Sequence, residues 1–398
     1  MIFRGDGMKY SVAIIGGGII GSSAAYFLAR AGTDVSVAVI EKDSSYSNAT
    51  TTQGAGGVRQ QFSVEENIAQ STFSLDFYKH WEAHMVDVPN LSDLKFRQQG
   101  YLFAVTAEGE DSLLRNEALQ RSMGVKTIVM DREELRRTFP SIDREDIVKS
   151  VYTPDDGWID PNAGLWGFRL AAEHHGAAYI NGRATGIETT KTKVLGVTLE
   201  NGRKIEADYI INCAGPWVND IAKMTGAELP IAPMCRLQHF WKCPHEFEDL
   251  PLVKDESGMF FRPEGSGFVG GRPSFDIEPG YVKDIYSGFF ANYFKDTVWP
   301  LMAALVPKFE DLRFQRSWGG HYAQNLFDGN VIIGAYSEGH DNLLTACGFS
   351  GHGVMHAPAV GRALSELVLN GSYQTIDLTR FGYDRVTRNE PLREMGIK

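Results

Sequence analysis

Residues Tyr10 to Gly21 read YSVAIIGGGIIG, and this stretch decides the fold. Its first half is rich in β-branched and other apolar residues, which predicts a short buried strand over 10–15. Its glycines predict a tight turn that opens a helix over 22–31, and a second buried strand is predicted over 35–40. Strand, turn, helix and strand in this order indicate a βαβ unit at the start of a Rossmann-like domain.

The glycine turn carries the pattern of a dinucleotide site. Gly16, Gly18 and Gly21 fit G-x-G-x-x-G, in which the first glycine permits the turn, the second admits a pyrophosphate and the third lets helix and strand pack closely. Glu41 ends the second strand about 20 residues later, where a carboxylate accepts ribose hydroxyls and repels a 2′-phosphate. The alternative is a glycine-rich turn without a ligand. The cofactor residues predicted here are Gly16, Gly18, Ile19, Ile20, Gly21, Glu41 and Lys42.

Three later stretches favour FAD over NAD as the dinucleotide. The loop over 48–59 (NATTTQGAGGVR) offers hydroxyls, an amide and exposed backbone to a diphosphate, a ribityl chain and a flavin ring. A buried strand runs into a small-residue turn over 208–217, and a second glycine-rich turn over 348–361 opens the last predicted helix. The alternatives are a flexible loop and ordinary strand-to-helix packing. The cofactor residues predicted from these later parts of the chain are Thr50, Thr51, Thr52, Gln53, Gly54, Ala55, Gly56, Arg59, Ala184, Cys213, Ala214, Gly215, Trp217, Gly351, His352, Gly353, Val354 and Met355.

The composition argues against several other classes of protein. The 398 residues carry a formal net charge of -11, so no overall basic field would gather phosphates, and we expect no nucleic-acid partner. The four cysteines form no C-x-x-C pair, which supports neither a disulfide framework nor a zinc site, and we predict no metal site. No apolar run approaches the ~20 residues of a transmembrane helix, and residues 1–8 lack a hydrophobic signal core, so we expect a cytoplasmic protein without a transmembrane segment.

Together, these motifs resemble those of the D-amino-acid oxidase superfamily, especially its sarcosine-oxidase-like branch of flavoproteins. The resemblance is strongest at 56–63 (GGVRQQFS), at Phe327-Asp328 and at 371–378 (GSYQTIDL). Those stretches are similar to a subgroup of FAD-dependent oxidoreductases in mitochondria and bacteria, whose mitochondrial members are linked to the assembly of respiratory complex I.

The resemblance implies an α/β fold with a split FAD-binding domain of the p-hydroxybenzoate-hydroxylase type over 8–92, 152–230 and 325–390. It implies a substrate domain built on an antiparallel sheet over 93–151 and 231–324. Relatives that attach flavin covalently use a cysteine near the start of the stretch over 318–322, which reads WGGHY here and has no thiol. We therefore expect noncovalent FAD, with a link through His321 as a remote alternative.

The resemblance also implies a reaction. We expect oxidation of the C–N bond of a secondary amine or an N-methyl amino acid by hydride transfer to flavin, followed by hydrolysis of the imine. Two other readings stay open: FAD as a structural element of an assembly protein, and oxidation of a 2-hydroxy acid. The implied catalytic residues are His352, Tyr322 and His321, and the candidates for substrate binding are Arg262, Arg272, Trp318 and Met355.

Departures from the family leave the substrate and the electron acceptor open. The lysine and the arginine that bind the substrate carboxylate in sarcosine-oxidising relatives are replaced by Met355 and Phe62. The lysine that promotes reaction with O2 in those relatives is replaced by Val269. Among the possible acceptors, O2, a quinone or an electron-transfer protein, this replacement favours the latter two.

Overall fold

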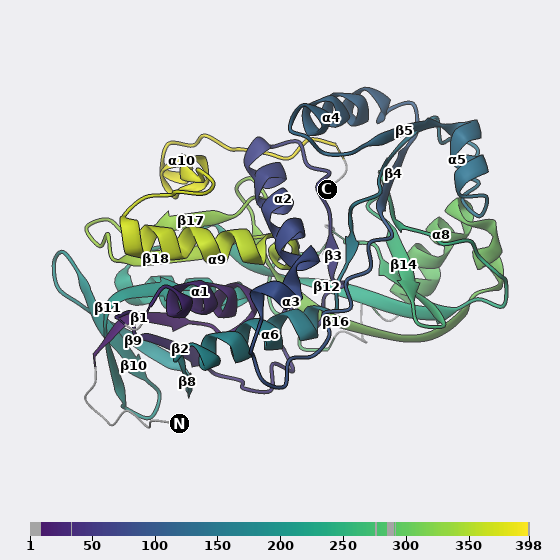
Figure 1. Ribbon diagram of the computed structural model, residues 1–398. Helices are drawn as coiled ribbons and strands as arrows, with labels where there is room; N and C mark the ends of the chain where they lie inside the picture. Colours follow the sequence, from purple (N-terminus) through teal and green to yellow (C-terminus); the bar gives the residue numbers. More distant parts are fainter. Residues whose placement is uncertain (1–8, 33, 275–276, 285–289, 291, 397–398) are drawn as a thin grey trace.

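The structure is a computed structural model that describes residues 9–32, 34–274, 277–284, 290 and 292–396. It has two lobes, each built around one large sheet (Figure 1). Segments from the start, middle and end of the chain form the first lobe, and the two inserted segments between them form most of the second. The α/β class predicted from the sequence is confirmed.

The first sheet is mainly parallel and follows the order β17-β18-β11-β1-β2-β8. Strand β1 lies at its centre and pairs in parallel with β2 and β11, as expected for a βαβ unit. The hairpin β9-β10 extends β11 on the outer side. The strands are β1 (Tyr10–Ile15), β2 (Val37–Glu41), β8 (Ala178–Asn181), β9 (Ala184–Thr189), β10 (Val194–Leu199), β11 (Lys204–Asn212), β17 (Ile332–Ala335) and β18 (Leu343–Cys347).

Helices α1 (Ile19–Arg30), α6 (Pro161–His174) and α9 (Gly353–Asn370) cover one face of this sheet, with α1 in contact with both of the others (Figure 1). Small residues allow α9 to approach α1 closely, since a Cβ at Gly361 of α9 would overlap Ser23 of α1. Helix α2 (Glu65–Lys79) packs on α9 and is followed by the short α3 (Trp81–His84).

Helices α2 and α3 are separated at His80, and the helical backbone begins only at Glu65. The backbone before Glu65 is extended because its polar groups bond elsewhere. The Gln60 N–H donates to Asp156 Oδ2 at 3.0 Å, and the Ser63 N–H donates to Glu394 Oε2 at 2.6 Å.

The second sheet follows the order β16-β12-β15-β14-β13-β4-β6-β5. It is not wholly antiparallel, contrary to the sequence prediction, because β4 of the first insert joins β13 of the second in parallel. Its two longest strands, β12 and β16, pair from Ile231 and Asn325 to Lys242 and Arg313. The strands are β4 (Tyr101–Val105), β5 (Ile128–Asp131), β6 (Lys149–Thr153), β12 (Ile231–Lys242), β13 (Leu252–Asp255), β14 (Phe260–Glu264), β15 (Gly267–Gly271) and β16 (Arg313–Asn325).

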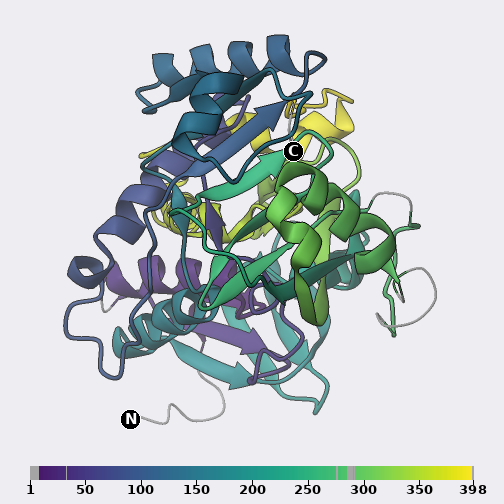
Figure 2. The ribbon, with the colours of Figure 1, turned by 90° about the vertical axis from the view of Figure 1, so that its right-hand side faces the viewer.

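The two faces of this second sheet differ because side chains alternate along each strand. Leu237 of β12 and Val253 of β13 belong to an apolar core that also holds Phe309. Figure 2 shows α8 (Trp299–Leu305) in green and α4 (Glu110–Ser122) and α5 (Arg132–Thr138) in blue on the outer parts of this lobe. The opposite face of the sheet is turned toward the first lobe.

Short elements complete the chain. The pair β3 (Gly57–Val58) and β7 (Gly157–Trp158) is antiparallel, and α7 (Val218–Ala222) and α10 (Asp384–Thr387) are single turns. The 3-10 segments are Gly215–Trp217, Lys223–Thr225, Pro307–Asp311 and Thr379–Phe381, and Phe294–Val298 is a π-helical turn.

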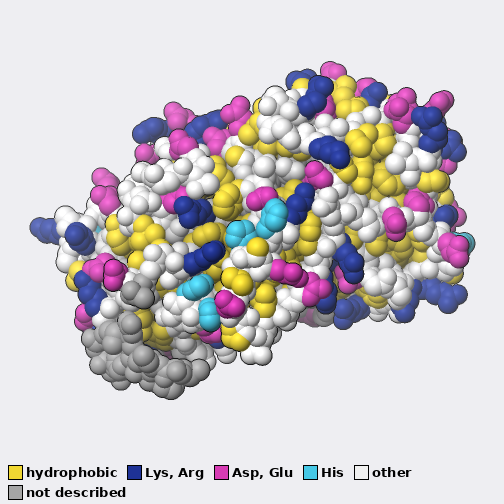
Figure 3. Space-filling model, in the orientation of Figure 1, with side chains coloured by type: hydrophobic (Ala, Val, Ile, Leu, Met, Phe, Trp, Pro, Cys, Tyr) yellow, Lys and Arg dark blue, Asp and Glu magenta, His cyan; other side chains and the backbone are white. Residues whose placement is uncertain are grey.

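Within the described ranges, no helix combines the length and the apolar character needed to cross a membrane. On the face shown in Figure 3, basic and acidic side chains are intermixed rather than gathered into single-sign areas. Opposite charges therefore offset one another locally on that face.

Candidate functional site

A cavity of about 1180 Å³ lies between the two lobes. The carboxyl ends of β1, β2, β8 and β11 open onto it, through Ile15, Glu41, Gly182 and Cys213. The inner face of the second sheet closes its other side, and the start of α9 lies at the same end. Ligands of open α/β sheets bind at this place, outside the carboxyl ends of the strands.

The glycine turn after β1 has the geometry that its pattern predicts. Gly16 has a φ of +101°, and a Cβ there would overlap the carbonyl oxygen of Cys213. A Cβ at Gly21 would overlap the carbonyl of Gly16, so this glycine serves the packing of helix on strand and does not line the cavity. Gly18 differs, because a Cβ there would have only Thr51 Oγ1 nearby, at 3.8 Å, and would project into the cavity.

Glu41 lies at the rim next to this turn. Its Oε2 accepts the Gly17 N–H and its Oε1 accepts the Asp43 N–H, each at 2.8 Å. These two hydrogen bonds hold the carboxylate in place, and its oxygens keep further lone pairs that can accept hydrogen bonds from ribose hydroxyls. Beside it the Lys42 ammonium lies 3.1 Å from the ring centroid of Trp217, and burial together with the Arg183 cation lowers the pKa of Lys42 to about 8.

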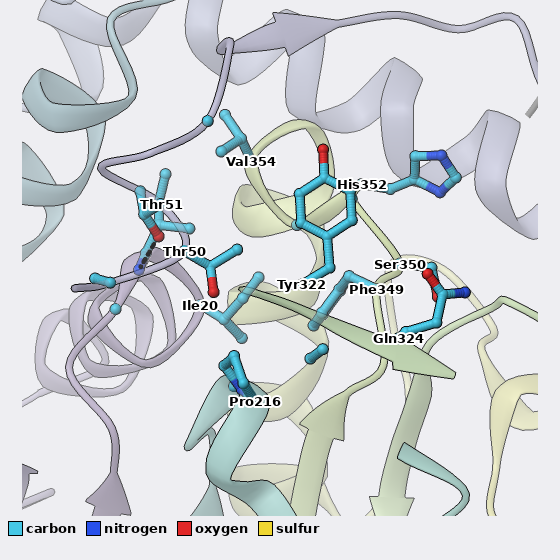
Figure 4. A pocket seen from close by; sticks show the side chains of 18 of the residues that line it. Ile20, Thr50, Thr51, Pro216, Tyr322, Gln324, Phe349, Ser350, His352 and Val354 are labelled. Carbon is cyan, nitrogen blue, oxygen red and sulfur yellow. Dashed lines mark hydrogen bonds between the residues drawn. The ribbon is translucent and has the colours of Figure 1, made fainter. Parts of the chain in front are cut away.

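These features fit an FAD molecule. The backbone at Gly18 leaves room for a diphosphate where a side chain would fill the space, and the N-terminal end of α1 favours its negative charge. Thr51 closes the turn, because its Oγ1 accepts the Ile19 N–H at 3.4 Å (Figure 4). The Thr50 hydroxyl donates to the carbonyl of His321 at 2.6 Å and so ties this loop to β16.

Arg59 and His352 meet in the cavity wall at the start of α9. An Nη of Arg59 donates to Nε2 of His352 at 3.3 Å, and the guanidinium stacks 4.1 Å from the ring of Phe62. A guanidinium can only donate, so Nε2 must be the acceptor and the proton of His352 must sit on Nδ1. Burial and the Arg59 cation hold the pKa of His352 well below its usual range. His352 is therefore neutral, and it can donate a hydrogen bond through Nδ1.

Tyr322 of β16 lies between the loop of Thr50 and Thr51 and the turn of His352 (Figure 4). Its ring lies on Gly351, whose φ is +102° and whose Cβ, if present, would come within 2.7 Å of the ring. Burial raises the pKa of Tyr322, so its hydroxyl keeps its proton. The glycine of this turn is thus needed for the tyrosine to fit.

The second sheet contributes residues that were not among the predicted site residues. Arg236 and Gln238 of β12 line the cavity, as do Leu252 and Lys254 of β13. Gln238 is only 3% exposed, and its Oε1 has no hydrogen-bond partner within the described part of the chain. The available signal was the alternation of Cys235, Arg236, Leu237 and Gln238, which places polar side chains on one face of an otherwise apolar strand.

Four predicted residues from the loop and from β16 do not line the cavity. Thr52 donates to the Tyr46 carbonyl and Gln53 donates to the Ser47 carbonyl, both at 2.9 Å, so these side chains turn back onto their own loop. The Trp318 indole donates to the Gln53 carbonyl at 3.3 Å, and Nε2 of His321 accepts the Val282 N–H at 2.9 Å. The Trp318 contact joins the loop to the second sheet.

The two arginines predicted to bind the substrate are also engaged elsewhere. Nε of Arg262 donates to the Ala55 carbonyl at 2.8 Å, and its guanidinium forms an ion pair with Glu264. Nε of Arg272 donates to the Ser257 carbonyl at 3.0 Å. Neither arginine lines the cavity, and we do not retain them as substrate ligands.

The remaining predicted residues do line the cavity. They are Gly16, Gly18, Ile19, Ile20, Glu41, Lys42, Thr50, Thr51, Gly54, Ala55, Gly56, Arg59, Ala184, Cys213, Ala214, Gly215, Trp217, Tyr322, Gly351, His352, Gly353, Val354 and Met355.

A C-terminal segment, which the sequence reading did not include, forms part of the wall through Arg393, Glu394 and Gly396. The Glu394 carboxylate accepts the N–H and the hydroxyl of Ser63 and the amide of Asn67, each at 2.6 Å. This segment follows α10 and is held against the start of α2.

The turn from β16 to β17 is fixed by a buried ion pair. Nε of Arg385 donates to Oδ2 of Asp328 at 2.7 Å, and the two side chains are 5% and 0% exposed. The same guanidinium donates to the Val331 carbonyl, and Asp328 also accepts the Leu392 N–H. Because residues 324–329 line the cavity, this pair sets part of its shape.

Comparisons with known proteins agree with this geometry. The family described as FAD dependent oxidoreductase matches residues 11–367. The chain is 34% identical over 427 residues to FAD-dependent oxidoreductase domain-containing protein 1 of Xenopus laevis, covering 98% of this chain and 85% of that protein. It is 26% identical over 396 residues to a 4-methylaminobutanoate oxidase (formaldehyde-forming) of Paenarthrobacter nicotinovorans, covering 94% of this chain and 46% of that protein. The crystal structure of L-proline dehydrogenase from P. horikoshii superposes with a TM-score of 0.83 at 27% identity, covering 96% of this chain and 99% of that one.

Proposed function

The chain belongs to the family of FAD-dependent oxidoreductases, and from this premise we propose that it oxidises the C–N bond of a secondary amine or an N-methyl amino acid. The similarity to a 4-methylaminobutanoate oxidase supports an N-methylated substrate. The similarity to L-proline dehydrogenase supports a secondary amine. In either case the product is an imine that water hydrolyses to a carbonyl compound and an amine.

One observation carries the proposal. The cavity runs without interruption from the glycine turn and Glu41 to the polar inner face of the second sheet. A dinucleotide at the first end would therefore bring its redox group to a chamber walled by Tyr322, Gln238 and Lys254. Such a chamber can hold a small polar substrate against a flavin.

FAD, when bound, supplies the acceptor for the hydride of the substrate. The chain's own residues orient the substrate and exclude water. Gln238 Oε1 accepts the N–H of the neutral amine, because it is a buried acceptor in need of a donor. The hydroxyl of Tyr322 and the Nδ1–H of His352 supply hydrogen-bond donors in the chamber. Leu252 and Phe260 cover the chamber with apolar surface.

Anaerobic mixing tests the proposal. The yellow protein is mixed with secondary amines, N-methyl amino acids, primary amino acids and 2-hydroxy acids, and the flavin absorbance near 450 nm is followed. We expect bleaching by N-methyl amino acids or secondary amines. Bleaching by hydroxy acids alone would replace the proposed substrate class. A fully loaded flavoprotein that no compound bleaches would contradict an amine-oxidising role and favour a structural role in assembly.

A first prediction concerns the attachment of the cofactor. Acid precipitation should release all the flavin into the supernatant, because the stretch over 318–322 has no thiol. The His321 ring does not line the cavity, and its Nε2 accepts a hydrogen bond from the Val282 N–H. The absorbance spectrum of the supernatant measures the released fraction. Yellow colour that stays with the washed pellet would show a covalent link.

A second prediction concerns the electron acceptor. Val269 is 2% exposed and lies opposite Arg262 in the second sheet, without a charge of its own. Unless Lys254, Arg272 or His352 substitutes for the missing lysine, we expect slow reoxidation by O2, and an acceleration of about tenfold or more in Val269→Lys, because each ~1.4 kcal/mol of stabilisation of a nascent oxygen anion is a factor of ten in rate.

Stopped-flow mixing of the reduced protein with air-saturated buffer measures this rate. Val269→Met is the matched control, since it adds length without charge and should leave reoxidation slow. Reoxidation of the unaltered protein at the rate of ordinary oxidases would overturn the prediction and make O2 the acceptor.

A further inference from the structure

Asp156 is a fully buried acid that the proposed reaction does not use. It lies between β6 and β7, is 0% exposed and is not part of the cavity lining. Its Oδ2 accepts the Gln60 N–H at 3.0 Å and the Thr153 hydroxyl at 2.5 Å. Its Oδ1 has no hydrogen-bond partner among the residues that the structure describes. Packing alone does not account for a buried carboxyl group that is bonded through one oxygen only, because an unpaired buried polar atom costs free energy.

The hydrogen bonds around Asp156 can accommodate it with or without a proton. Nε2 of Gln61 donates to the Thr153 hydroxyl at 2.8 Å, which leaves that hydroxyl free to donate its own proton. One acceptor for this proton is Oδ2 of Asp156, and the other is the Tyr101 carbonyl at 3.3 Å. The first arrangement suits the ionised carboxylate. The second suits the protonated acid, because the Thr153 oxygen then has a lone pair for the acidic proton.

The same bonds hold the backbone next to Arg59. Gln60 is the chain neighbour of Arg59, and the guanidinium donates to the carbonyl of Gln61 and to Nε2 of His352. The guanidinium also lies 4.1 and 5.0 Å from the centroids of two phenylalanine rings. Arg59 therefore reaches the cavity wall on a segment whose backbone is held from outside the cavity by Asp156.

Asp156 and Arg59 also respond to each other's charge. Burial raises the pKa of Asp156 to about 7, although the Arg59 cation and the two hydrogen bonds act in the opposite direction. Burial lowers the pKa of Arg59, and the Asp156 charge opposes this effect. Near neutral pH the acid can thus lose its proton beside the guanidinium and offset its charge. The other charged and titratable groups near this pair are Lys79, Tyr101, Tyr152, Asp155, Lys254, His352, His356 and Glu394.

We propose that Asp156 is a positioning residue for the redox chemistry of FAD in this site. Through the Gln60 N–H it holds Arg59 against His352, and through its charge it sets how strongly Arg59 stabilises an anion in the chamber. That anion is reduced FAD, since uptake of two electrons and one proton leaves one negative charge on the flavin ring. A proton on Asp156 removes its opposition to Arg59 and favours reduction, and loss of that proton disfavours it. This goes beyond the proposed function, because it concerns reduction of FAD by any donor.

Potentiometric titration of the holoprotein tests the proposal without a substrate. The flavin absorbance near 450 nm, followed from about pH 5.5 to about pH 9, gives the midpoint potential at each pH. At the acidic end Asp156→Asn should match the unaltered protein, because both side chains are neutral there. From about pH 7 upward its midpoint potential should become higher than that of the unaltered protein. We expect a difference of about 30 mV at the alkaline end, which corresponds to tenfold tighter binding of the Asp156 proton after reduction.

Asp155→Asn is the matched control. It removes the charge of the neighbouring acid, which is partly exposed, accepts a hydrogen bond from Gln98 and pairs with Lys79. Its curve should coincide with that of the unaltered protein. In Asp156→Asn the amide oxygen can still accept the Gln60 N–H, so the FAD content and the far-UV circular dichroism should stay unchanged.

Two further variants keep the test decisive. In Arg59→Met the pKa of Asp156 should rise further, because the cation that lowers it is gone, so the acid stays protonated. Adding Asp156→Asn to Arg59→Met should then have less than about a third of its effect in the unaltered protein. Thr153→Val removes a donor to the carboxylate and should move the pH dependence of the midpoint potential to higher pH, which provides a test even if Asp156→Asn fails to load FAD.

The outcomes separate this proposal from a structural role and from the proposed function. A difference between Asp156→Asn and the unaltered protein that is absent, or the same at every pH, overturns the proposal, since a structural role does not depend on the charge. A pH-dependent difference that persists in Arg59→Met, or a Thr153→Val curve that does not move, overturns it as well. Because no amine takes part, the expected curves support the proposal even if no amine bleaches the flavin, in which case only the proposed reaction fails.

Discussion

Replacing Gly18 by valine should yield a folded protein without FAD. The backbone at Gly18 is ordinary for any residue, with φ -61° and ψ -177°, and a Cβ there would touch only Thr51 Oγ1 at 3.8 Å. The side chain would nevertheless project into the cavity where the diphosphate must approach the backbone. We expect the FAD content to fall to about a tenth of the unaltered protein or less, because two methyl groups occupy that space.

The ratio of flavin to protein absorbance measures this effect, and far-UV circular dichroism checks the fold. Gly186→Val is the matched control, since Gly186 lies in β9 outside the cavity and its Cβ would make an ordinary 3.7 Å contact with Thr198. That variant should keep its FAD. Full FAD content in Gly18→Val would mean that the glycine turn does not hold the diphosphate.

Replacing Arg385 by methionine should cost about 3–5 kcal/mol in the free energy of unfolding, because it leaves the Asp328 carboxylate buried without its partner. The guanidinium also donates to the carbonyls of Asn330, Val331 and Phe381, and these bonds are lost with it. Since the turn over 324–329 lines the cavity, the affinity for FAD should fall as well.

Denaturant unfolding of the holoprotein and the apoprotein measures both effects. The control is Arg388→Met, which removes an exposed ion pair with Asp384 at the end of the same short helix. That change should cost under about 1 kcal/mol. Equal destabilisation by the two substitutions would contradict the role of the buried pair.

The local parts of the fold could be predicted from the sequence. Strand β1 has the predicted bounds, because its β-branched run specifies a strand and the glycines that follow specify a turn, both through residues that are neighbours in the chain. The parallel pairing of β4 with β13 could not be predicted, because it joins two inserts separated by more than a hundred residues, and nothing in either strand specifies the direction of its partner.

The same distinction holds for the site. Gly18 and Glu41 are placed by a motif with fixed spacing, and both line the cavity. Arg236 and Gln238 were missed because the register of the second sheet decides which face of β12 meets the first lobe. Gln53 and Arg262 were assigned to ligands because their chemistry suits one, but each finds a nearer backbone carbonyl.

The distribution of the cavity wall along the chain has a consequence for biosynthesis. Gly16 and Gly18 are made early, whereas Glu394 and Gly396 belong to the same wall and emerge from the ribosome much later. At roughly 5–20 residues per second, tens of seconds pass between them. The cofactor chamber is therefore incomplete throughout that interval, and FAD can be enclosed only after residue 396 has been translated. A chain shorter than this lacks one part of the wall that would enclose FAD.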